Sequence, residues 1–238
     1  MPITPITDTG TTDTGAPARH VGLGLPPFAY RGLRALCHGV NRAYFRVSVE
    51  GADVVPATGA VILAPVHRSN IDFLVVSEVS KRKLFYMAKD SLWRAPRFGT
   101  FLESIGAFPV HREGADRLAL DRSQDVLERG EALILFPEGT RRSGPVVEEL
   151  HEGAAFLAAR TGAPIVPIGI GGSDLAMPKG KILPKPLTIQ VVIGPAIPPP
   201  PRTGGGRVSR SSVHAATDDL VAKLQAVYDE ARAKTGRY

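Results

Sequence analysis

Short apolar runs alternate with segments of helical length along most of this chain, and this alternation constrains the fold more than any other feature. Two such helical segments span Ala115 to Glu128 and Glu148 to Arg160. Strands that alternate with helices are typical of an α/β fold, in which helices cover the faces of a sheet. The expected strands are residues 60–66, 84–88, 107–110, 132–136, 165–170 and 187–193.

The length and composition fit one folded domain with an anionic partner. A chain of 238 residues can bury one good-sized core, whereas two full domains would each be small. A hydrophobic share of 43% against 22% charged residues is that of a folded protein. The net charge of +6 favours nucleic acid, an anionic membrane surface or a phosphorylated substrate as a partner. The one cysteine, Cys37, cannot form an internal disulfide.

The first 48 residues predict a tail followed by an amphipathic helical segment. Residues 1–20 are rich in Thr, Gly, Pro and Asp, so we expect a disordered tail. The segment lacks the basic stretch followed by an apolar stretch that is typical of a secretory signal. Within residues 21–48 we expect a helix from Phe28 to Val47 with an apolar stripe on one side. The opposite side is basic and carries Arg31, Arg34, His38, Arg42 and Arg46.

This helix has two open interpretations, because periodicity is the same in both. The apolar stripe either packs on the protein's own core or lies in the plane of an anionic membrane surface, with the arginines near the headgroups. No stretch reaches the roughly 18 to 20 apolar residues of a helix that spans a bilayer.

The end of the chain predicts a linker and a terminal helix. Residues 198–212 are mostly Pro, Gly, Ser and Arg with few residues to bury, which indicates a linker after a main domain at 49–197. Apolar residues then recur at helical spacing, so we expect residues 213–238 to form a helix that packs back on the domain.

A first group of polar side chains, HRSNID, follows the apolar run at 60–66. His67 and Asp72 are five residues apart, and on a continuous helix they would point about 140° apart. Ser69 and Asn70 favour a turn between them, which lets the Asp72 carboxylate fold back onto the imidazole. Such a carboxylate orients a histidine that takes a proton from an alcohol. The structural alternative is a surface histidine and an aspartate that caps a helix.

A second group, FPEGTRRSG, follows the apolar run at 132–136. Gly139 lets the backbone approach a ligand closely, and the guanidinium of Arg141 has the forked donors that suit a phosphate. The structural alternative pairs Glu138 with an arginine and leaves the rest as an ordinary loop.

Two further groups are weak signals when each is taken by itself. The run GAFPVHR delivers Arg112 at the end of a short strand, and an arginine there is usually a solvated surface charge. The run APIVPI contains Pro167 and no reactive group, so by itself it indicates core.

In this order and spacing the four groups resemble the PlsC-type family of glycerophosphate and lysophosphatidate acyltransferases. HRSNID is similar to the HxxxxD block of that family, and FPEGTRRSG to its FPEGTRS block. GAFPVHR is similar to its GxxFxxR block and APIVPI to its last, proline-containing block. The resemblance covers residues 50–195 and departs from the family pattern at Val66, where Asn is common, and at Arg142, where Ser is common.

The resemblance implies a fold, an activity and a set of site residues. It implies a mixed β-sheet flanked by helices in a single α/β domain, preceded by a helix that docks on membranes. It implies transfer of a fatty acyl group from acyl-CoA or acyl carrier protein to lysophosphatidic acid, giving phosphatidic acid without a metal or prosthetic group. His67 is then the general base and Asp72 orients it. The implied substrate-binding residues are Arg112, Glu138, Gly139, Thr140 and Arg141.

Other functions stay open on the residues alone. The acceptor could be glycerol 3-phosphate or another lysophospholipid, and His67 could activate water in a thioesterase or hydrolase. A non-catalytic basic protein is a further alternative, but no nucleic-acid-binding motif is present, so we expect no nucleic acid partner. The expected location is peripheral, on the cytoplasmic face of the cell membrane.

Overall fold

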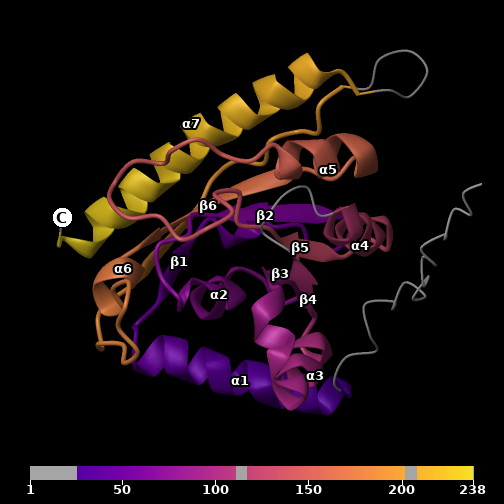
Figure 1. Ribbon diagram of the computed structural model, residues 1–238. Coiled ribbons are helices and arrows are strands. Elements are labelled where there is room, and N and C mark those ends of the chain that lie inside the picture. Colours follow the sequence, from indigo (N-terminus) through magenta and orange to yellow (C-terminus); the bar gives the residue numbers. More distant parts are fainter. Residues whose placement is uncertain (1–25, 111–116, 202–207, 238) are drawn as a thin grey trace, which may run out of the picture.

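The computed structural model describes residues 26–110, 117–201 and 208–237. The predicted tail at 1–20 and the site residue Arg112 lie outside the described residues. Within them the chain forms one seven-stranded sheet with helices on both faces, which confirms the predicted α/β class (Figure 1).

The sheet is mixed, as the family resemblance implies. Its strand order is β1-β7-β6-β2-β5-β3-β4. The five strands from β6 to β4 run parallel, β7 runs antiparallel to β6, and β1 runs parallel to β7. The strands are β1 (Ser48–Glu50), β2 (Val61–Pro65), β3 (Leu84–Lys89), β4 (Ala107–Val110), β5 (Ala132–Ile134), β6 (Ile165–Gly171) and β7 (Gln190–Ile193).

The helices form a layer on each face of the sheet, and one face carries a second layer. Helices α4, α5 and α7 cover one face, whereas α2 lies under the other, with α1 and α3 farther out (Figure 1). The helices are α1 (Pro27–Ala43), α2 (Asp72–Val75), α3 (Pro96–Ser104), α4 (Arg117–Glu128), α5 (Gly153–Thr161), α6 (Ser173–Ala176) and α7 (Arg210–Thr235), with single 3-10 turns η1 (Ala52–Val54), η2 (Val76–Val79) and η3 (Asp90–Arg94).

Strand β2 lies in the middle of the core and leads to the first motif. All five of its residues are buried, because β5 and β6 flank it on either side and helices cover both faces. Strand β5, also fully buried, leads to the second motif. Since β2 and β5 are parallel neighbours, their carboxyl ends lie at the same edge of the sheet.

Helix α7 packs unusually close to strand β6. Gly169 and Gly171 of β6 face it, and a Cβ at either position would overlap the main-chain carbonyl of Val227 or Ala231, respectively. The helix begins inside the predicted linker, because the hydroxyl of Ser209 accepts a hydrogen bond from the Ser212 N–H at 3.0 Å and caps it.

Helix α1 attaches to the domain through polar side chains, two of which, Arg34 and His38, come from the side predicted to be basic. Arg34 donates from Nη2 to the Ser80 carbonyl at 2.6 Å, and Asn41 donates from Nδ2 to Oε1 of Glu78 at 2.9 Å. His38 Nδ1 lies 2.6 Å from the other Glu78 oxygen. Arg34 and His38 therefore face the protein, because η2 and the loop after it offer carbonyl and carboxylate oxygens there.

The helix is also shorter than the predicted span from Phe28 to Val47. Arg46 has a positive φ of 44°, which no right-handed helix continues. The chain turns at this point, and the side chain of Phe45 enters the core.

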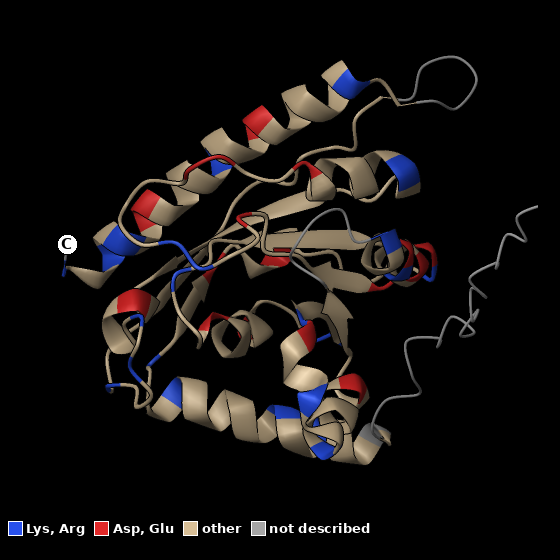
Figure 2. Ribbon diagram, in the orientation of Figure 1, with Lys and Arg blue, Asp and Glu red and all other residues tan. Residues whose placement is uncertain are grey.

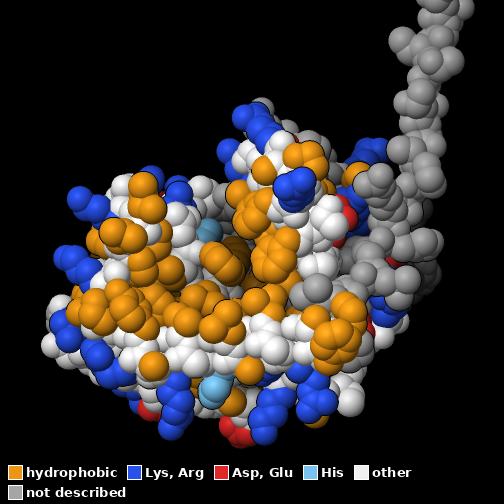
Figure 3. Space-filling model, turned by 90° about the horizontal axis from the view of Figure 1, so that it is seen from below, with side chains coloured by type: hydrophobic (Ala, Val, Ile, Leu, Met, Phe, Trp, Pro, Cys, Tyr) orange, Lys and Arg blue, Asp and Glu red, His pale blue; other side chains and the backbone are white. Residues whose placement is uncertain are grey.

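Half of the predicted apolar stripe of α1 is exposed, and the stripe stays outside the core. Leu36 is 65% exposed, and Val40 and Tyr44 are also exposed, whereas Ala29, Leu33 and Cys37 are half-buried. Phe28, at the start of the helix, is 77% exposed. Figure 3 shows apolar side chains gathered around a hollow on this side of the molecule. We call the following residues the apolar face: Phe28, Leu36 and Val40 of α1, Tyr44 directly after it, Leu92 of η3, and Phe98 and Phe101 of α3.

Helix α1 carries basic but no acidic side chains along its length (Figure 2). Among the described residues, no helix combines the length and the apolar character that crossing a membrane requires.

Candidate active site

The two main motifs meet where β2 and β5 end. His67 follows β2 by two residues and Glu138 follows β5 by four. The two loops are joined directly, because the main-chain N–H of His67 donates to Glu138 Oε1 at 2.9 Å. The Arg142 N–H donates to the His67 carbonyl at 2.9 Å, so the second loop holds both main-chain groups of His67.

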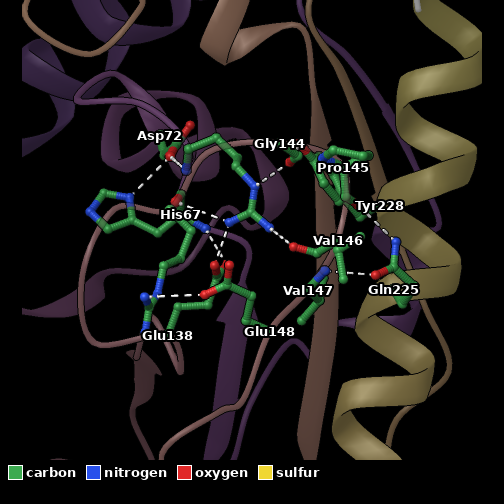
Figure 4. Close-up of polar contacts among 12 residues, drawn as sticks. His67, Asp72, Glu138, Gly144, Pro145, Val146, Val147, Glu148, Gln225 and Tyr228 are labelled. Atoms are coloured by element: carbon green, nitrogen blue, oxygen red, sulfur yellow. Dashed lines mark hydrogen bonds and ion pairs between the residues drawn. The ribbon is translucent and has the colours of Figure 1, made fainter.

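His67 and Asp72 are brought together by the predicted turn. His67 Nδ1 lies 3.0 Å from Asp72 Oδ2 (Figure 4). The same oxygen accepts the N–H groups of Arg68 and Ser69, each at 2.7 Å. These bonds close the turn, and Asp72 then begins α2 with a side chain that is fully buried. The carboxylate is therefore held in one orientation toward the imidazole.

The imidazole of His67 is held at Nδ1 and left open at Nε2. A carboxylate can only accept hydrogen bonds, so in the neutral ring Nδ1 carries the proton and Nε2 keeps its lone pair. The ring packs against Phe136 with centroids 4.3 Å apart, and the side chain keeps 13% of its surface exposed. Figure 4 shows Nε2 pointing away from Asp72 and Glu138. The arrangement can take up a proton from a group that approaches Nε2.

Glu138 lies in the protein interior, where its carboxylate binds other protein groups. One oxygen accepts the His67 N–H, and the other pairs with Nη1 of Arg68. Both side chains of this ion pair are fully buried. The structure thus matches the structural alternative for this residue, a pairing with an arginine, and leaves Glu138 no exposed oxygen for a ligand.

Arg68, for which the sequence predicted no role, is a central residue of this site. It follows the histidine of the first motif, and its guanidinium also donates to the carbonyls of Gly144 and Val146. Burial opposes its charge, but the Glu138 carboxylate outweighs that effect and raises the pKa of Arg68 above its ordinary value. The signal in the sequence was an arginine at the end of an apolar strand, together with a glutamate at the end of another.

The rest of the second motif forms the surface beside the histidine. Gly139 has a φ of +66°, in the left-handed region that favours glycine, and a Cβ there would lie 2.5 Å from Cδ2 of His151. Thr140 is exposed and Arg141 half-buried. No hydrogen bond or ion pair with another described residue engages the Arg141 guanidinium, so it is available to an anion.

The two weaker motifs lie on the same sheet as the stronger ones. Strand β4, which leads toward Arg112, is parallel to β3 and ends at the same edge as β2 and β5. Pro167 lies buried inside β6, paired with Ala64 of β2. A proline is tolerated there although it cannot donate a ladder hydrogen bond.

A family model and several known proteins match this chain, and all of them are acyltransferases. The family model described as Acyltransferase matches residues 46–171, which is more than half of the chain. The 1-acyl-sn-glycerol-3-phosphate acyltransferase of Bacillus subtilis is 32% identical over 149 residues, 62% of this chain and 72% of that protein. The Pseudomonas aeruginosa protein of the same name is 31% identical over 166 residues, 65% of this chain and 60% of that protein.

More distant relatives share the fold or part of the sequence. A chloroplastic 1-acyl-sn-glycerol-3-phosphate acyltransferase of Arabidopsis thaliana is 28% identical over 58% of this chain, which spans 39% of that protein. The crystal structure of the 1-acyl-sn-glycerophosphate acyltransferase PlsC of Thermotoga maritima matches with a TM-score of 0.67 at 22% identity, over 85% of this chain and 81% of that chain. That likeness shows a shared fold. The chain therefore belongs to the PlsC-type acyltransferase family.

Proposed function

We propose that this protein transfers a fatty acyl group from a thioester to the free hydroxyl of lysophosphatidic acid, giving phosphatidic acid. The observation that carries the proposal is the His67–Asp72 pair, with Nε2 open, beside the unengaged guanidinium of Arg141. The names of the Bacillus and Pseudomonas relatives support lysophosphatidic acid as the acceptor. Glycerol 3-phosphate and other lysophospholipids are the alternative acceptors.

In the proposed reaction Nε2 of His67 takes the proton of the acceptor hydroxyl as its oxygen attacks the thioester carbonyl carbon. The C–S bond then breaks, the imidazolium returns the proton to the leaving thiolate, and an ester and a free thiol are formed. The buried Asp72 carboxylate stabilises the transient positive charge on the ring. General-base help of this kind contributes about 10²- to 10⁴-fold in rate.

The proposed acceptor site lies on the second loop. Arg141 suits the phosphate, since a guanidinium forms two parallel bonds with its oxygens, and Gly139 lets the acceptor approach the backbone. Thr140 can donate from its hydroxyl, and Arg112 is proposed as a second cation. For Glu138, burial and its bonds to Arg68 support a positioning role instead of the ligand contact that the family resemblance implies.

A peripheral position on an anionic membrane, at the cytoplasmic face of the cell membrane, is part of the same proposal. The apolar face defined above is exposed, and a group of large exposed apolar side chains is typical of interaction sites. The acceptor and product both reside in a bilayer interface, so an enzyme docked there need not extract them into water. Apolar burial and attraction of the basic side chains to anionic headgroups then add.

The test uses the purified full chain with labelled acyl-CoA and either lysophosphatidic acid or glycerol 3-phosphate in anionic vesicles. We expect labelled phosphatidic acid from the first acceptor. His67→Ala should lower kcat at least about 100-fold, whereas the exposed His214→Ala serves as a matched control and should retain full activity. Release of free fatty acid without lipid acylation would instead identify a thioesterase.

The same assay separates the acyl donors and tests Arg141. Acyl carrier protein replaces CoA as the carrier in a parallel reaction, and the better donor is the one with the higher kcat/KM. Arg141→Ala should raise KM for the phosphorylated acceptor by about tenfold, with little change for the donor, because a charge-assisted bond to phosphate is lost. An equal change for both substrates would contradict the assignment.

A further inference from the structure

Helix α7 reaches the active-site region through two polar side chains. Gln225 Nε2 donates to the Pro145 carbonyl at 3.0 Å, and its Oε1 accepts the Val147 N–H at 2.7 Å. The hydroxyl of Tyr228, one turn later, donates to the Gly144 carbonyl at 3.2 Å. Figure 4 shows both side chains extending from the helix toward this segment. Residues 144–147, which we call the bridging segment, are thus bonded to α7 on one side.

Arg68 holds the other side of the bridging segment. Its Nε donates to the Gly144 carbonyl at 3.2 Å and its Nη2 to the Val146 carbonyl at 3.1 Å. The Gly144 carbonyl therefore accepts from Arg68 and Tyr228 together. The Tyr228 ring also lies against the guanidinium, with the Arg68 Cζ 4.8 Å from the ring centroid.

The contacts continue from Arg68 to the main chain of the catalytic histidine. Nη1 of Arg68 donates to the His67 carbonyl at 3.2 Å and pairs with Glu138, whose other oxygen accepts the His67 N–H. Every link in this series is a hydrogen bond or a buried ion pair. It runs from α7, through the bridging segment, to both main-chain groups of His67.

The central members of the series are shielded from water. Arg68, Glu138 and Tyr228 are buried, and a charge buried in this way is costly to leave without its partner. Burial raises the pKa of the Tyr228 phenol although the charge of Arg68 opposes it, so the phenol remains a donor. None of these groups has solvent with which to exchange its partners.

We propose that Gln225 and Tyr228 of α7 are positioning residues for the acyl transfer. They hold the bridging segment against Arg68, so that Arg68 and Glu138 fix the main chain of His67 and with it the position of Nε2. This inference rests on the proposed function, and it assigns to the C-terminal helix a part in the reaction besides covering the sheet.

A small displacement of His67 is enough to lower the rate of acyl transfer substantially. An error of about 1 Å in the position of a catalytic group can cost about 100-fold in rate, because the reacting atoms lose their alignment. Loss of a contact in α7 would be transmitted to Nε2 without altering the surface that binds the substrates. The signature is therefore a lower kcat with an unchanged KM.

The experiment compares four variants of the full chain at a temperature well below unfolding. Gln225→Ala removes both bonds to the bridging segment from a half-buried site, so it is expected to fold. Tyr228→Leu removes the hydroxyl and the ring, whereas Tyr228→Phe keeps the ring. Val213→Ala is the control, because it removes buried apolar contact from the same helix about 18 Å away from Gln225.

We expect kcat to fall about tenfold or more in Gln225→Ala and Tyr228→Leu, with KM for both substrates within about twofold. Tyr228→Phe should lie between Tyr228→Leu and wild type, because it keeps the ring against Arg68 but loses the hydrogen bond to the Gly144 carbonyl, and Val213→Ala should keep the kcat of wild type. Combined with Glu138→Gln, the effect of Gln225→Ala should be clearly less than additive, since both act through the position of His67.

A second measurement needs no turnover. In protein labelled with ¹⁵N at histidine, the ring nitrogens of His67 can be identified by their loss in His67→Ala among the six histidines of the chain. We expect the wild-type signal of an Nδ1-protonated ring, and a shifted or broadened signal in Gln225→Ala but not in Val213→Ala.

The outcomes separate this inference from the proposed function. A wild-type protein that transfers no acyl group contradicts the proposed function, while the His67 signal still tests the positioning. Normal kcat and an unchanged His67 signal in Gln225→Ala and Tyr228→Leu overturn the positioning role. An equal loss of kcat in Val213→Ala also overturns it, because the effect would then follow from lower stability of the helix alone.

Discussion

Helices α1 and α7 both have an amphipathic sequence, yet they are attached to the domain in opposite ways. Helix α7 buries apolar side chains, including Leu220 and Leu224, against β6 and β7. Helix α1 is bonded through Arg34 and Asn41, and it leaves Leu36 in the open. The apolar side of a helix therefore does not by itself identify the side that meets the protein.

The surface beneath each helix explains the difference. Under α7 the sheet offers apolar side chains and the glycines of β6, which allow the helix to approach closely. Under α1 lie α2, η2 and the loop after them, which offer the Leu74 carbonyl, the Glu78 carboxylate and the Ser80 carbonyl, respectively. The side of a helix that faces the protein is therefore the one that matches the surface beneath it. An apolar surface selects apolar side chains, whereas carbonyls and carboxylates select hydrogen-bond donors, because buried acceptors need a partner.

The largest difference in stability should come from replacing a glycine by alanine at two places, in strand β6 beneath α7 and within α1. Gly169→Ala should lower the free energy of unfolding by about 3 kcal/mol or more, because its Cβ would overlap a main-chain carbonyl that cannot move aside. Gly32→Ala in α1 has open space around it and should raise stability by about 0.5 to 1 kcal/mol. Urea unfolding measures both, and equal effects would break the comparison.

The exposed stripe of α1 should act in binding to vesicles. Leu36→Asp should reduce flotation with anionic vesicles by the equivalent of about 1.5 to 3 kcal/mol, because one leucine no longer enters the interface. Leu118→Asp on α4 is the matched control, since Leu118 is similarly apolar and 49% exposed but lies on the other face of the sheet. Equal flotation of the two variants would contradict docking through α1.

The polar attachment of α1 should be measurable at Cys37. Burial and the nearby Glu78 raise the pKa of its thiol, so at neutral pH little thiolate is present and alkylation is slow. Asn41→Ala removes two hydrogen bonds and should weaken the attachment by about 1 to 3 kcal/mol, which accelerates alkylation of Cys37. An unchanged alkylation rate would mean that other contacts hold α1.

The smallest effect on binding per substituted residue should come from the basic side chains of α1 that have no partner among the described residues. Arg31 and Arg42 are exposed, whereas Arg34 and Arg46 are bonded to main-chain carbonyls of the domain. Arg31→Gln with Arg42→Gln should weaken binding to anionic vesicles by about 1 kcal/mol for each charge, and high salt should abolish the difference. Neutral vesicles provide the control, since there the variant should match wild type.

Much of the site could be predicted because its determinants are local. The apolar runs predicted strands at 107–110, 132–136 and 165–170, each within two residues of β4, β5 and β6. Ser69 and Asn70 predicted the turn that brings Asp72 onto His67. Strand β1 and helix α3 were not predicted, since the one has three residues and the other nine, which is too short for a clear helical periodicity.

By itself the sequence determined the α/β class and the two loops at strand ends, and it indicated the His67–Asp72 pairing, because periodicity and turn residues act over a few positions. Only the tertiary structure decided that Glu138 lies buried against Arg68, that α7 reaches the bridging segment, and that α1 leaves half of its predicted apolar stripe exposed. In each of these cases the partner is distant in sequence. The partner of a buried charge, and the side of a helix that faces the protein, depend on residues that come together only when the sheet has formed.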